Sequence, residues 1–559
     1  MNGAFQVAAS MLVRWVTARF KDKTRRTGAV QRAFLLKLLR QQQNTAFGRQ
    51  HGLDRIRTVE QFRARLPIRS YDYYRPYAER VARGEPNVLT AAPVDCLNIS
   101  SGSTGRQKFI PVTPQARRAR GKAHLTGICF GILAAQQQQR SIGQVLMPGP
   151  IQLAGHTAAG IPYAPVSVGD LRSKNWLSRQ LFAHPYEALQ PSNSLARHYA
   201  CLLFALKNRN TRIIAATFPV LALRICQYLE DYAESLIADL ARGTIAAWVP
   251  LEAGLRKRLE RRLSPAPQRA QQLQQVVERN GRLTPIAAWP NLAFVVTARG
   301  GTSDFYLQKF TQYFGDTPVF GGIYSSNEAV FGICSNFDDD SAILAIESGF
   351  YEFVPPQEWN KQQPETLLAE QVIIGEQYRI LVTNYNGFYR YDIGDIVEVV
   401  GFYGNAPTIV FRYRWGGTLS STTEKTTETH VVRTIQRLQR EFNLTLENFC
   451  ITLAEHQIPP PYILNIELAS GASLDNPQAF LQRFDSELKA IHDFYAIKRQ
   501  SQIPPPQLRI LAPGSFAQVR ERMYQNGIPE NHVKVPHISE DSNLLADLQI
   551  KQEYAFASS

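Results

Sequence analysis

YRILVTNYNGFYRYDIGDIVEVVGF, residues 378–402, decides the fold class of the middle of the chain. Apolar runs lie on both sides of Asn386-Gly387, and this dipeptide is a strong signal for a hairpin turn. Similar apolar and aromatic runs occur at residues 342–355 and 408–414. We therefore expect antiparallel strands from about residue 340 onward.

The sequence before this region has a different pattern. Residues 1–95 are expected to be mainly helical, because apolar positions recur at helical spacing, as in VQRAFLLKLLRQQQ. Short apolar strands then alternate with helical patterns, at residues 145–149, 212–218, 292–297 and 318–324. This alternation predicts an α/β fold, with a large multi-layer N-terminal domain in which mixed sheets and helices are joined by antiparallel strands.

A polar stretch with a glycine pair, residues 414–428, follows and indicates a domain boundary. Beyond it, the order strand, strand, helix, strand, helix predicts a small α+β domain, whose first helix starts at Asn476-Pro477. We therefore expect two domains, residues 1–415 and 416–559. A chain of 559 residues also exceeds what one hydrophobic core usually supports.

Composition limits the classes of function. The net charge of +15 favours anionic partners such as a nucleotide, a nucleic acid or an anionic lipid surface. No zinc finger or ribonucleoprotein motif occurs, and we expect basic runs such as RRAR (117–120) to be solvated helix faces, so no nucleic acid is expected as a partner. Trp15 and Phe20 have basic neighbours and suit either a membrane surface or, as we favour, a helix packed on the domain.

The cysteines and the apolar segments indicate the compartment. The six cysteines are scattered without CxxC spacing, so neither a zinc site nor a redox dithiol is expected. The chain has no run of about 18 uncharged apolar residues, so no integral membrane segment is expected, and its first residues lack a signal-peptide layout. Buried thiols in a reducing compartment, the cytoplasm, are the simplest expectation.

SSGSTGRQK, residues 100–108, is the first candidate binding segment. Gly102 and Gly105 allow backbone N–H groups to converge, and the hydroxyls and Lys108 add donors and a positive charge. This set suits a phosphate, although it is neither a P-loop nor GxGxxG. On composition alone, a polar structural loop is the alternative.

Three further segments hold candidate site residues. In GGIYSSNEAVFGI (321–333), Tyr324 can flank a flat base and Glu328 can hold Mg²⁺, or the segment is a plain turn with a solvated carboxylate. Asp395 follows Gly394 between two strands and suits either the hydroxyls of a ribose or an ordinary β-turn. Lys534 follows Val533 in an extended segment that can aim it, although most lone lysines are solvated.

In this order the segments resemble the acyl-adenylate-forming superfamily, and most closely the GH3 acyl acid-amido synthetases. The similarity spans roughly residues 30–540. The segments that carry it are LLRQQQNTAFGRQHGL, ISSGSTGRQKFIPVT, YSSNEAVFGI, GFYEFVP, LVTNYNGFYRYDIGDIVEVVGF and GIPENHVKVP.

The resemblance implies ATP and Mg²⁺ as cofactors. It implies a loop that holds the ATP phosphates, formed by Ser100, Ser101, Gly102, Ser103, Thr104, Gly105 and Lys108. Tyr324 and Ser326 would line the adenine and α-phosphate pocket, whereas Asp395 and Arg414 would lie at the ribose. The resemblance also implies two catalytic residues, Glu328 as the Mg²⁺ ligand and Lys534, which a mobile C-terminal domain would bring to the α-phosphate.

The implied reaction activates a small carboxylic acid as an acyl-adenylate, with release of pyrophosphate, and then transfers the acyl group to the amine of an amino acid. The loop at residues 100–108 is one residue shorter than is usual in the plant enzymes, so the acyl acid stays open, as does the oligomeric state. Two alternatives remain: an adenylating ligase that forms a coenzyme A thioester, and a basic protein that binds nucleic acid or a membrane surface without catalysis.

Overall fold

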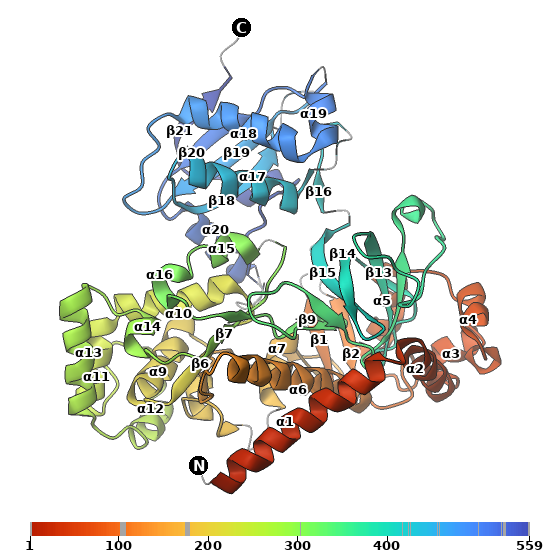
Figure 1. The fold of residues 1–559 in the computed structure, drawn as a ribbon, viewed down its shortest axis with the longest axis horizontal. Coiled ribbons are helices and arrows are strands. Elements are labelled where there is room, and N and C mark those ends of the chain that lie inside the picture. Colours follow the sequence, from red (N-terminus) through yellow and green to blue (C-terminus); the bar gives the residue numbers. More distant parts are fainter. Residues whose placement is uncertain are drawn as a thin grey trace. The chain divides into compact units, whose positions relative to one another are not determined.

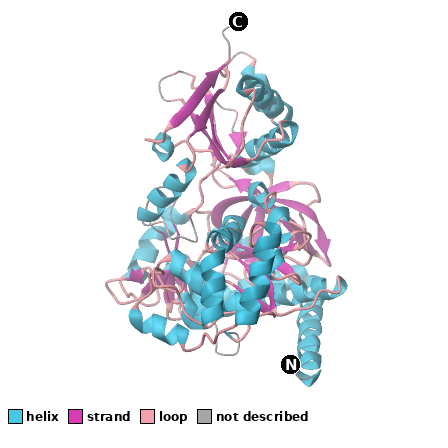
Figure 2. Ribbon diagram, turned by 90° about the vertical axis from the view of Figure 1, so that its left-hand side faces the viewer, coloured by secondary structure: helices cyan, strands magenta, loops and turns pink. Residues whose placement is uncertain are grey.

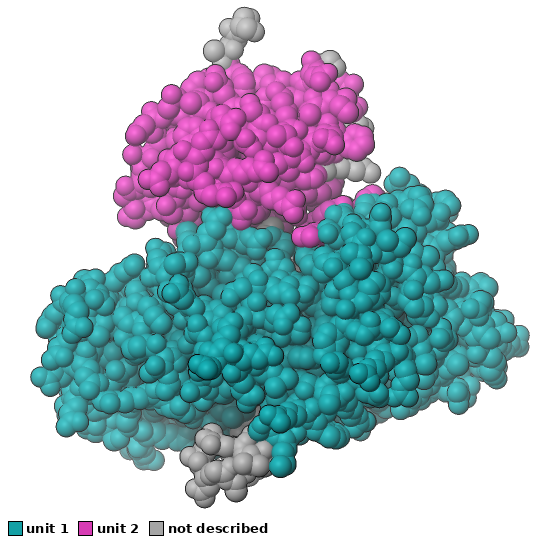
Figure 3. All heavy atoms as spheres, in the orientation of Figure 1, with its two compact units in different colours: residues 1–411 teal, residues 412–559 magenta. Residues whose placement is uncertain are grey.

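The computed structural model describes residues 3–100, 108–173, 179–301, 303–415, 417–422, 424, 426–454, 457, 459–500, 502–526, 528 and 533–556. The chain forms two compact units, Met1–Phe411 and Arg412–Ser559 (Figure 3). Helices and strands occur in both units (Figure 2). Among the described residues, no helix is long and apolar enough to cross a membrane.

Unit 1 begins with helices, as the apolar spacing predicts. They are α1 (Gly3–Thr24), α2 (Thr27–Gln42), α3 (Ala46–Gln50), η1 (Leu53–Arg55), α4 (Val59–Arg65) and α5 (Tyr71–Ala82). Helix α2 buries Leu35, Leu38 and Leu39. Helix α1 runs alongside α6 (Pro114–Gln137) (Figure 1), with Phe20 buried and Trp15 57% exposed. The N-terminal helix is therefore packed on the unit and still presents one large aromatic ring to solvent.

A parallel sheet with the order β3-β6-β7-β8 forms the α/β part. Its strands are β3 (Gln144–Leu146), β6 (Thr211–Ala215), β7 (Phe294–Val296) and β8 (Val319–Phe320). The helical segments between them include η2 (Tyr186–Leu189), α9 (Ser194–Lys207), α10 (Pro219–Asp231), α11 (Ala233–Arg242), α12 (Ala253–Glu260), α13 (Pro267–Asn280), α14 (Pro285–Ala288), α15 (Ser303–Leu307) and α16 (Thr311–Phe314). The predicted alternation of strands and helices is confirmed.

A second sheet has the order β2-β1-β5-β4. Its strands are β1 (Cys96–Ser100), β2 (Lys108–Val112), β4 (Gly155–His156) and β5 (Pro162–Ala164), and α7 (Val166–Arg172) follows them. Strands β1 and β2 are antiparallel, and Ser100 is paired with Lys108. The two ends of the Ser/Gly-rich segment are therefore held side by side.

A third sheet has the order β12-β13-β14-β15-β11-β10-β9. Its strands are β9 (Ile323–Ser325), β10 (Val330–Ile333), β11 (Ala342–Leu344), β12 (Phe350–Val354), β13 (Gln377–Thr383), β14 (Tyr391–Tyr403) and β15 (Ala406–Arg414), with η3 (Pro356–Glu358) after β12. The pairs β12–β13 and β13–β14 are antiparallel, as the sequence of residues 378–402 predicts. Gly387 lies in the connecting turn with φ of 87°, and a Cβ there would come within 2.6 Å of Leu89 Cβ, so glycine is required.

Unit 2 contains a sheet with the order β18-β19-β20-β21. The described elements of unit 2 are β16 (Thr418–Leu419), β17 (Thr426–Thr427), α17 (Glu428–Glu441), β18 (Leu446–Leu453), β19 (Tyr462–Leu468), α18 (Pro477–Ile491), α19 (Asp493–Arg499), β20 (Gln507–Leu511), α20 (Ser515–Gln525), η5 (Ser542–Leu545) and β21 (Ile550–Ala555). Asn476 caps α18, because its side chain accepts a 2.9 Å hydrogen bond from the Ala479 N–H. The expected strand and helix order is present, but α17, α19 and β21 were not predicted.

Candidate active site

A β-bulge positions Asp395. In the β13–β14 ladder, Arg379 pairs with Ile396 and Leu381 pairs with Asp392. Between these two pairs, β14 therefore has extra residues that have no partner on β13. Gly394 has φ of 82° at this point. A bulge redirects side chains away from the regular alternation. The result is a buried Asp395 carboxylate, whose Oδ2 accepts a 2.7 Å hydrogen bond from the Tyr324 hydroxyl.

Tyr324 lies on β9 and is held by aromatic neighbours. Its ring stacks on Phe331, with centroids 5.1 Å apart, and lies 5.7 Å from the ring of Phe411. Two residues that are widely separated in sequence, Tyr324 and Asp395, therefore meet as the sequence predicts for one ligand site. An aromatic face next to a carboxylate offers stacking for a base and acceptance of hydroxyl donors.

A tight turn follows β9 and orients Glu328. The Ser326 hydroxyl accepts hydrogen bonds from the N–H groups of Glu328, at 3.1 Å, and Ala329, at 3.2 Å. The Ser326 N–H in turn donates to the Ala329 carbonyl at 2.8 Å. The hydroxyl of Ser326 is thus engaged with the turn itself, which fixes the backbone on which Glu328 is carried.

Glu328 is buried, with only 6% of the residue exposed. The Tyr391 hydroxyl donates to its Oε1 at 3.4 Å, and the Asn384 side chain donates to its backbone carbonyl at 2.9 Å. Both partners come from the stretch around the predicted turn, at the end of β13 and the start of β14. The segment that decides the sheet therefore also forms the surroundings of Glu328.

Arg120 on α6 joins this turn to α7. Its guanidinium pairs with both oxygens of Asp170, at 2.9 and 3.1 Å, and donates to Ser325 Oγ at 3.2 Å and to the Ser326 carbonyl at 3.3 Å. Burial opposes ionisation of Asp170, but Arg120 and the nearby His124 hold its pKa well below the usual range. The turn is therefore clamped by a charged pair, and the expectation that this part of RRAR is solvated was wrong.

A cavity of about 60 Å³ adjoins the turn. The polar side chains that line it include Asn98, Arg120, Asp170, Glu328 and Asn384. A space of this size that includes several polar groups can hold water. It is a small pocket of mixed polar and apolar lining beside Glu328.

The Ser/Gly-rich segment is only partly described. Ser101, Gly102, Ser103, Thr104 and Gly105 lie outside the described residues, as does the side chain of Ser100. At the described end, Lys108 Nζ lies 5.3 Å from the centre of the Tyr71 ring. The Tyr71 hydroxyl donates to the Phe109 carbonyl at 2.9 Å, and burial raises its pKa to about 12. Lys108 is therefore held at the base of the segment.

In unit 2, the segment that contains Lys534 lies along an edge of the sheet. Val533 and Val535 are buried on either side of the lysine. The Ile451 N–H of β18 donates to the His537 carbonyl at 2.9 Å, and Ile451 forms a parallel bridge with Ile538. This anchorage supports an aimed lysine. Arg414 ends β15 and is exposed.

No group of three His, Cys, Asp or Glu residues that suits a metal ion occurs in the described part of the chain. A single buried carboxylate is nevertheless what Mg²⁺ often uses together with substrate phosphates. Glu328 therefore suits a Mg²⁺ ion that also binds substrate phosphates, and not a metal ion held by protein ligands alone.

Sequence reasoning missed Arg120, Asp170 and Asn384. Asn384 lies two residues before the turn signal Asn386-Gly387, and its local sequence does not mark it as a site residue. Arg120 lies in a basic run whose neighbours face solvent, and Asp170 lies far away in the sequence, so neither position has a local signal. Contacts between α6, α7 and the turn after β9 define them.

Models of the GH3 family match residues 16–319 (N-terminal domain), 342–414 (central domain) and 429–543 (C-terminal domain). The indole-3-acetic acid-amido synthetase GH3.17 of Arabidopsis thaliana is 25% identical, with 92% of each chain covered. The corresponding GH3.8 enzyme of Oryza sativa subsp. indica is 26% identical, with 93% of this chain and 89% of the relative covered.

Solved structures agree with the fold class. The GH3.15 acyl acid amido synthetase has a TM-score of 0.86 at 22% identity, with 97% of each chain covered. A 2-hydroxyisobutyryl-CoA ligase in complex with 2-HIB-AMP has a TM-score of 0.55 at 12% identity, with 93% of this chain and 90% of the ligase covered. The α/β fold class that the sequence predicts is therefore confirmed.

Proposed function

The chain belongs to the GH3 family, and from this premise we propose that it is an ATP-dependent acyl acid-amido synthetase that joins a small carboxylic acid to the amine of an amino acid. The observation that carries this proposal is the hydrogen bond between Tyr324 and Asp395, next to the turn in which Ser326 accepts from the N–H of Glu328. These are the residues for which the family pattern implies roles at ATP.

The reaction has two balanced steps. A carboxylate oxygen of the acid attacks the α-phosphorus of ATP and forms the phosphorus–oxygen bond of a mixed acyl–phosphate anhydride. The bond from the α-phosphorus to the oxygen that bridges to the β-phosphorus breaks, so that pyrophosphate leaves with its electron pair. The amine then attacks the acyl carbon, loses a proton, and AMP leaves with the electron pair of the broken carbon–oxygen bond. Activation is needed because a free carboxylate has no adequate leaving group.

ATP is held by groups with complementary chemistry. Tyr324 flanks the adenine, and Asp395 accepts the ribose hydroxyls while Tyr324 fixes its orientation at 2.7 Å. The segment from Ser100 to Lys108 binds the phosphates, and the β1–β2 pairing holds its ends together. Glu328 binds Mg²⁺, which supplies positive charge at the transferring phosphate when bound.

Lys534 adds positive charge at the α-phosphate. The burial of Val533 and Val535 and the pairing of this segment with β18 support a fixed direction for its side chain. Because Lys534 and Arg414 belong to unit 2 whereas Glu328 belongs to unit 1, we propose that the smaller unit moves between the two half-reactions, about residues near 415.

Pyrophosphate release with a panel of carboxylic acids tests this proposal. We expect release that requires ATP, Mg²⁺ and one class of acid, and an amide that forms only when an amino acid is added. Thioester formation with coenzyme A in place of the amide, or pyrophosphate release independent of any acid, would contradict it.

The variant Lys534→Ala tests the role of the lysine. Removing a charge that stabilises the transferring phosphate is expected to slow acyl-adenylate formation about 100-fold or more, while circular dichroism stays unchanged. Lys551→Ala is the matched control, because Lys551 is an exposed lysine of β21 in the same unit. Normal turnover of Lys534→Ala would remove this residue from the mechanism.

The compartment is a separate proposal. All six cysteines are free thiols, and burial raises the pKa of Cys129 to about 11 and that of Cys334 to about 12. Protonated, buried thiols need no oxidising environment, which supports the cytoplasm as the location.

A further inference from the structure

A groove lined by arginines lies on unit 1, with none of its lining residues in the cavity beside Glu328. Its volume is about 700 Å³. It lies between the end of α4 and the segment of residues 362–366. Its lining residues include four arginines, Arg63, Arg65, Arg69 and Arg390, and one acidic residue, Glu365.

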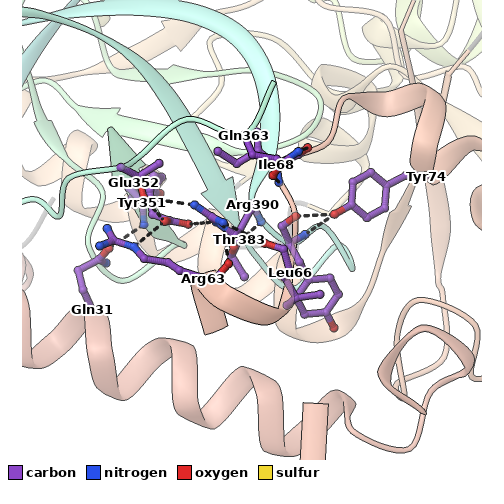
Figure 4. A network of polar contacts seen from close by, with 12 residues as sticks. Gln31, Arg63, Leu66, Ile68, Tyr74, Tyr351, Glu352, Gln363, Thr383 and Arg390 are labelled. Carbon is purple, nitrogen blue, oxygen red and sulfur yellow. Dashed lines mark hydrogen bonds and ion pairs between the residues drawn. The ribbon is translucent and has the colours of Figure 1, made fainter. Parts of the chain in front are cut away.

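A buried carboxylate fixes two of these arginines from beneath. Glu352 is 1% exposed, and its oxygens pair with Arg63 Nε at 3.0 Å and Arg390 Nε at 3.1 Å (Figure 4). The Thr366 hydroxyl donates to the same carboxylate at 2.6 Å. Arg390 Nη1 donates to the carbonyls of Arg63 and Leu66. The floor of the groove is therefore rigid and hydrogen-bonded.

The other two arginines have no carboxylate partner among the described residues. Arg65 is exposed, and Arg69 lies with its Cζ 5.3 Å from the Tyr73 ring. Arg69 Nε and Arg63 Nη2 are buried without a hydrogen-bond partner in the described structure. Glu352 pairs with Arg63 and Arg390, and Glu365 is the other carboxylate at the groove, so the four arginines leave an excess of positive charge there.

We propose that this groove binds a small phosphate-bearing anion, held by Arg65 and Arg69 with the outer edge of Arg63. Guanidinium groups bind phosphate oxygens through paired N–H donors, and a doubly charged phosphate matches the excess charge better than one carboxylate does. The side-chain amides of Gln362 and Gln363 also line the groove, and Ala64, Pro67 and Pro364 give apolar contact for an organic part. The volume is within the usual range of small-molecule sites.

This binding does not depend on the proposed synthetase reaction, so it is tested without ATP. Glycerol 3-phosphate is titrated into the full chain by isothermal titration calorimetry, with glycerol and citrate as the unphosphorylated and carboxylate probes. We expect binding of glycerol 3-phosphate alone. The double variant Arg65→Gln/Arg69→Gln is expected to weaken it about tenfold or more.

Two control variants separate this groove from other basic sites. Arg83→Gln changes an exposed arginine after α5 that is outside the groove, and Lys108→Gln changes the proposed ATP-phosphate segment. Both should bind glycerol 3-phosphate as the wild type does. Binding that survives the double variant, that is lost in Lys108→Gln, or that citrate reproduces would overturn the proposal.

Crystals of the wild-type chain soaked in tungstate, a phosphate mimic with strong anomalous scattering, give a readout that needs no variant. The expected peak lies between the guanidinium groups of Arg65 and Arg69. Tungstate bound elsewhere on unit 1, with this groove empty, would also contradict the proposal.

Discussion

The Tyr324 hydroxyl donates a 2.7 Å hydrogen bond to Oδ2 of Asp395, a buried carboxylate on a bulge of β14. The hydrogen bond links two strands of the third sheet that are not neighbours, since Tyr324 comes from β9 and Asp395 from β14. Neither side chain reaches this position through local structure alone. The bulge at Gly394 and the stacking of Tyr324 on Phe331 together bring them into contact.

Tyr324→Phe is expected to destabilise unit 1 by about 1–3 kcal/mol, because the buried Asp395 carboxylate loses a donor. The KM for ATP should rise, since the carboxylate is no longer oriented toward the ribose. Urea unfolding and pyrophosphate release measure the two effects. A double-mutant cycle with Asp395→Asn should show a coupling energy of about 1 kcal/mol, and additive effects would mean that the hydrogen bond is not the cause.

Glu328→Gln keeps the shape of the side chain and removes its charge. If Glu328 holds Mg²⁺, acyl-adenylate formation should fall about 100-fold or more, and added Mg²⁺ should restore part of it. Pyrophosphate release measured against Mg²⁺ concentration checks this expectation. Glu376→Gln, at an exposed position between strands, is the control and should behave as the wild type does. An unchanged Mg²⁺ dependence in Glu328→Gln would assign the metal to other ligands.

The antiparallel strands were predictable because apolar side chains recur on both sides of Asn386-Gly387, and that pattern sets the pairing of β13 and β14. The bulge at Gly394 was not, since an even number of extra residues in a strand keeps the alternation of its apolar side chains in phase. Strand β21 was missed for a related reason: its residues are mostly exposed, so its position depends on backbone pairing with β20 and not on burial.

The site residues also include some that a sequence pattern predicts and some that it does not. Tyr324 and Glu328 belong to a segment that follows a predicted strand, and Asp395 follows a glycine between two predicted strands, so their sequence context indicated them. Arg120 and Asp170 have no such context. Their pairing depends on how α6 and α7 pack beside the turn after β9, and a basic run such as RRAR has the same composition whether one of its arginines pairs with a carboxylate or none does.

Glu352→Gln is expected to destabilise the chain by about 3–5 kcal/mol. The substitution leaves Arg63 and the buried Arg390 without their shared carboxylate, and an uncompensated buried charge is costly. Urea unfolding gives the free energy. Glu370→Gln breaks the more exposed pair with Arg32 and should cost less than about 1 kcal/mol. Equal losses in the two variants would show that burial does not determine the effect.

His184 should make the folded chain sensitive to mild acid. Burial lowers its pKa to about 4, from an ordinary value near 6.5, and the ring stacks on Phe182. Its Nε2 accepts from the Met147 N–H at 3.4 Å, and its Nδ1 lies 3.2 Å from the Pro185 carbonyl. These contacts need a neutral ring, with Nδ1 as the donor. Protonation would remove the acceptor.

Between pH 6.5 and 4 the unfolded chain therefore binds a proton at this histidine that the folded chain does not, so stability must fall as the pH falls through this window. His184 alone should contribute about 1.4 kcal/mol per pH unit there, and nothing further below about pH 4. His537, whose pKa burial also lowers to about 4, acts in the same direction. His184→Gln should lower stability at neutral pH and flatten the slope. Urea unfolding from pH 7 to 4 measures both, and the exposed His156→Gln should retain the wild-type slope. A wild-type slope in His184→Gln would mean that the folded and the unfolded chain bind the proton of His184 equally well.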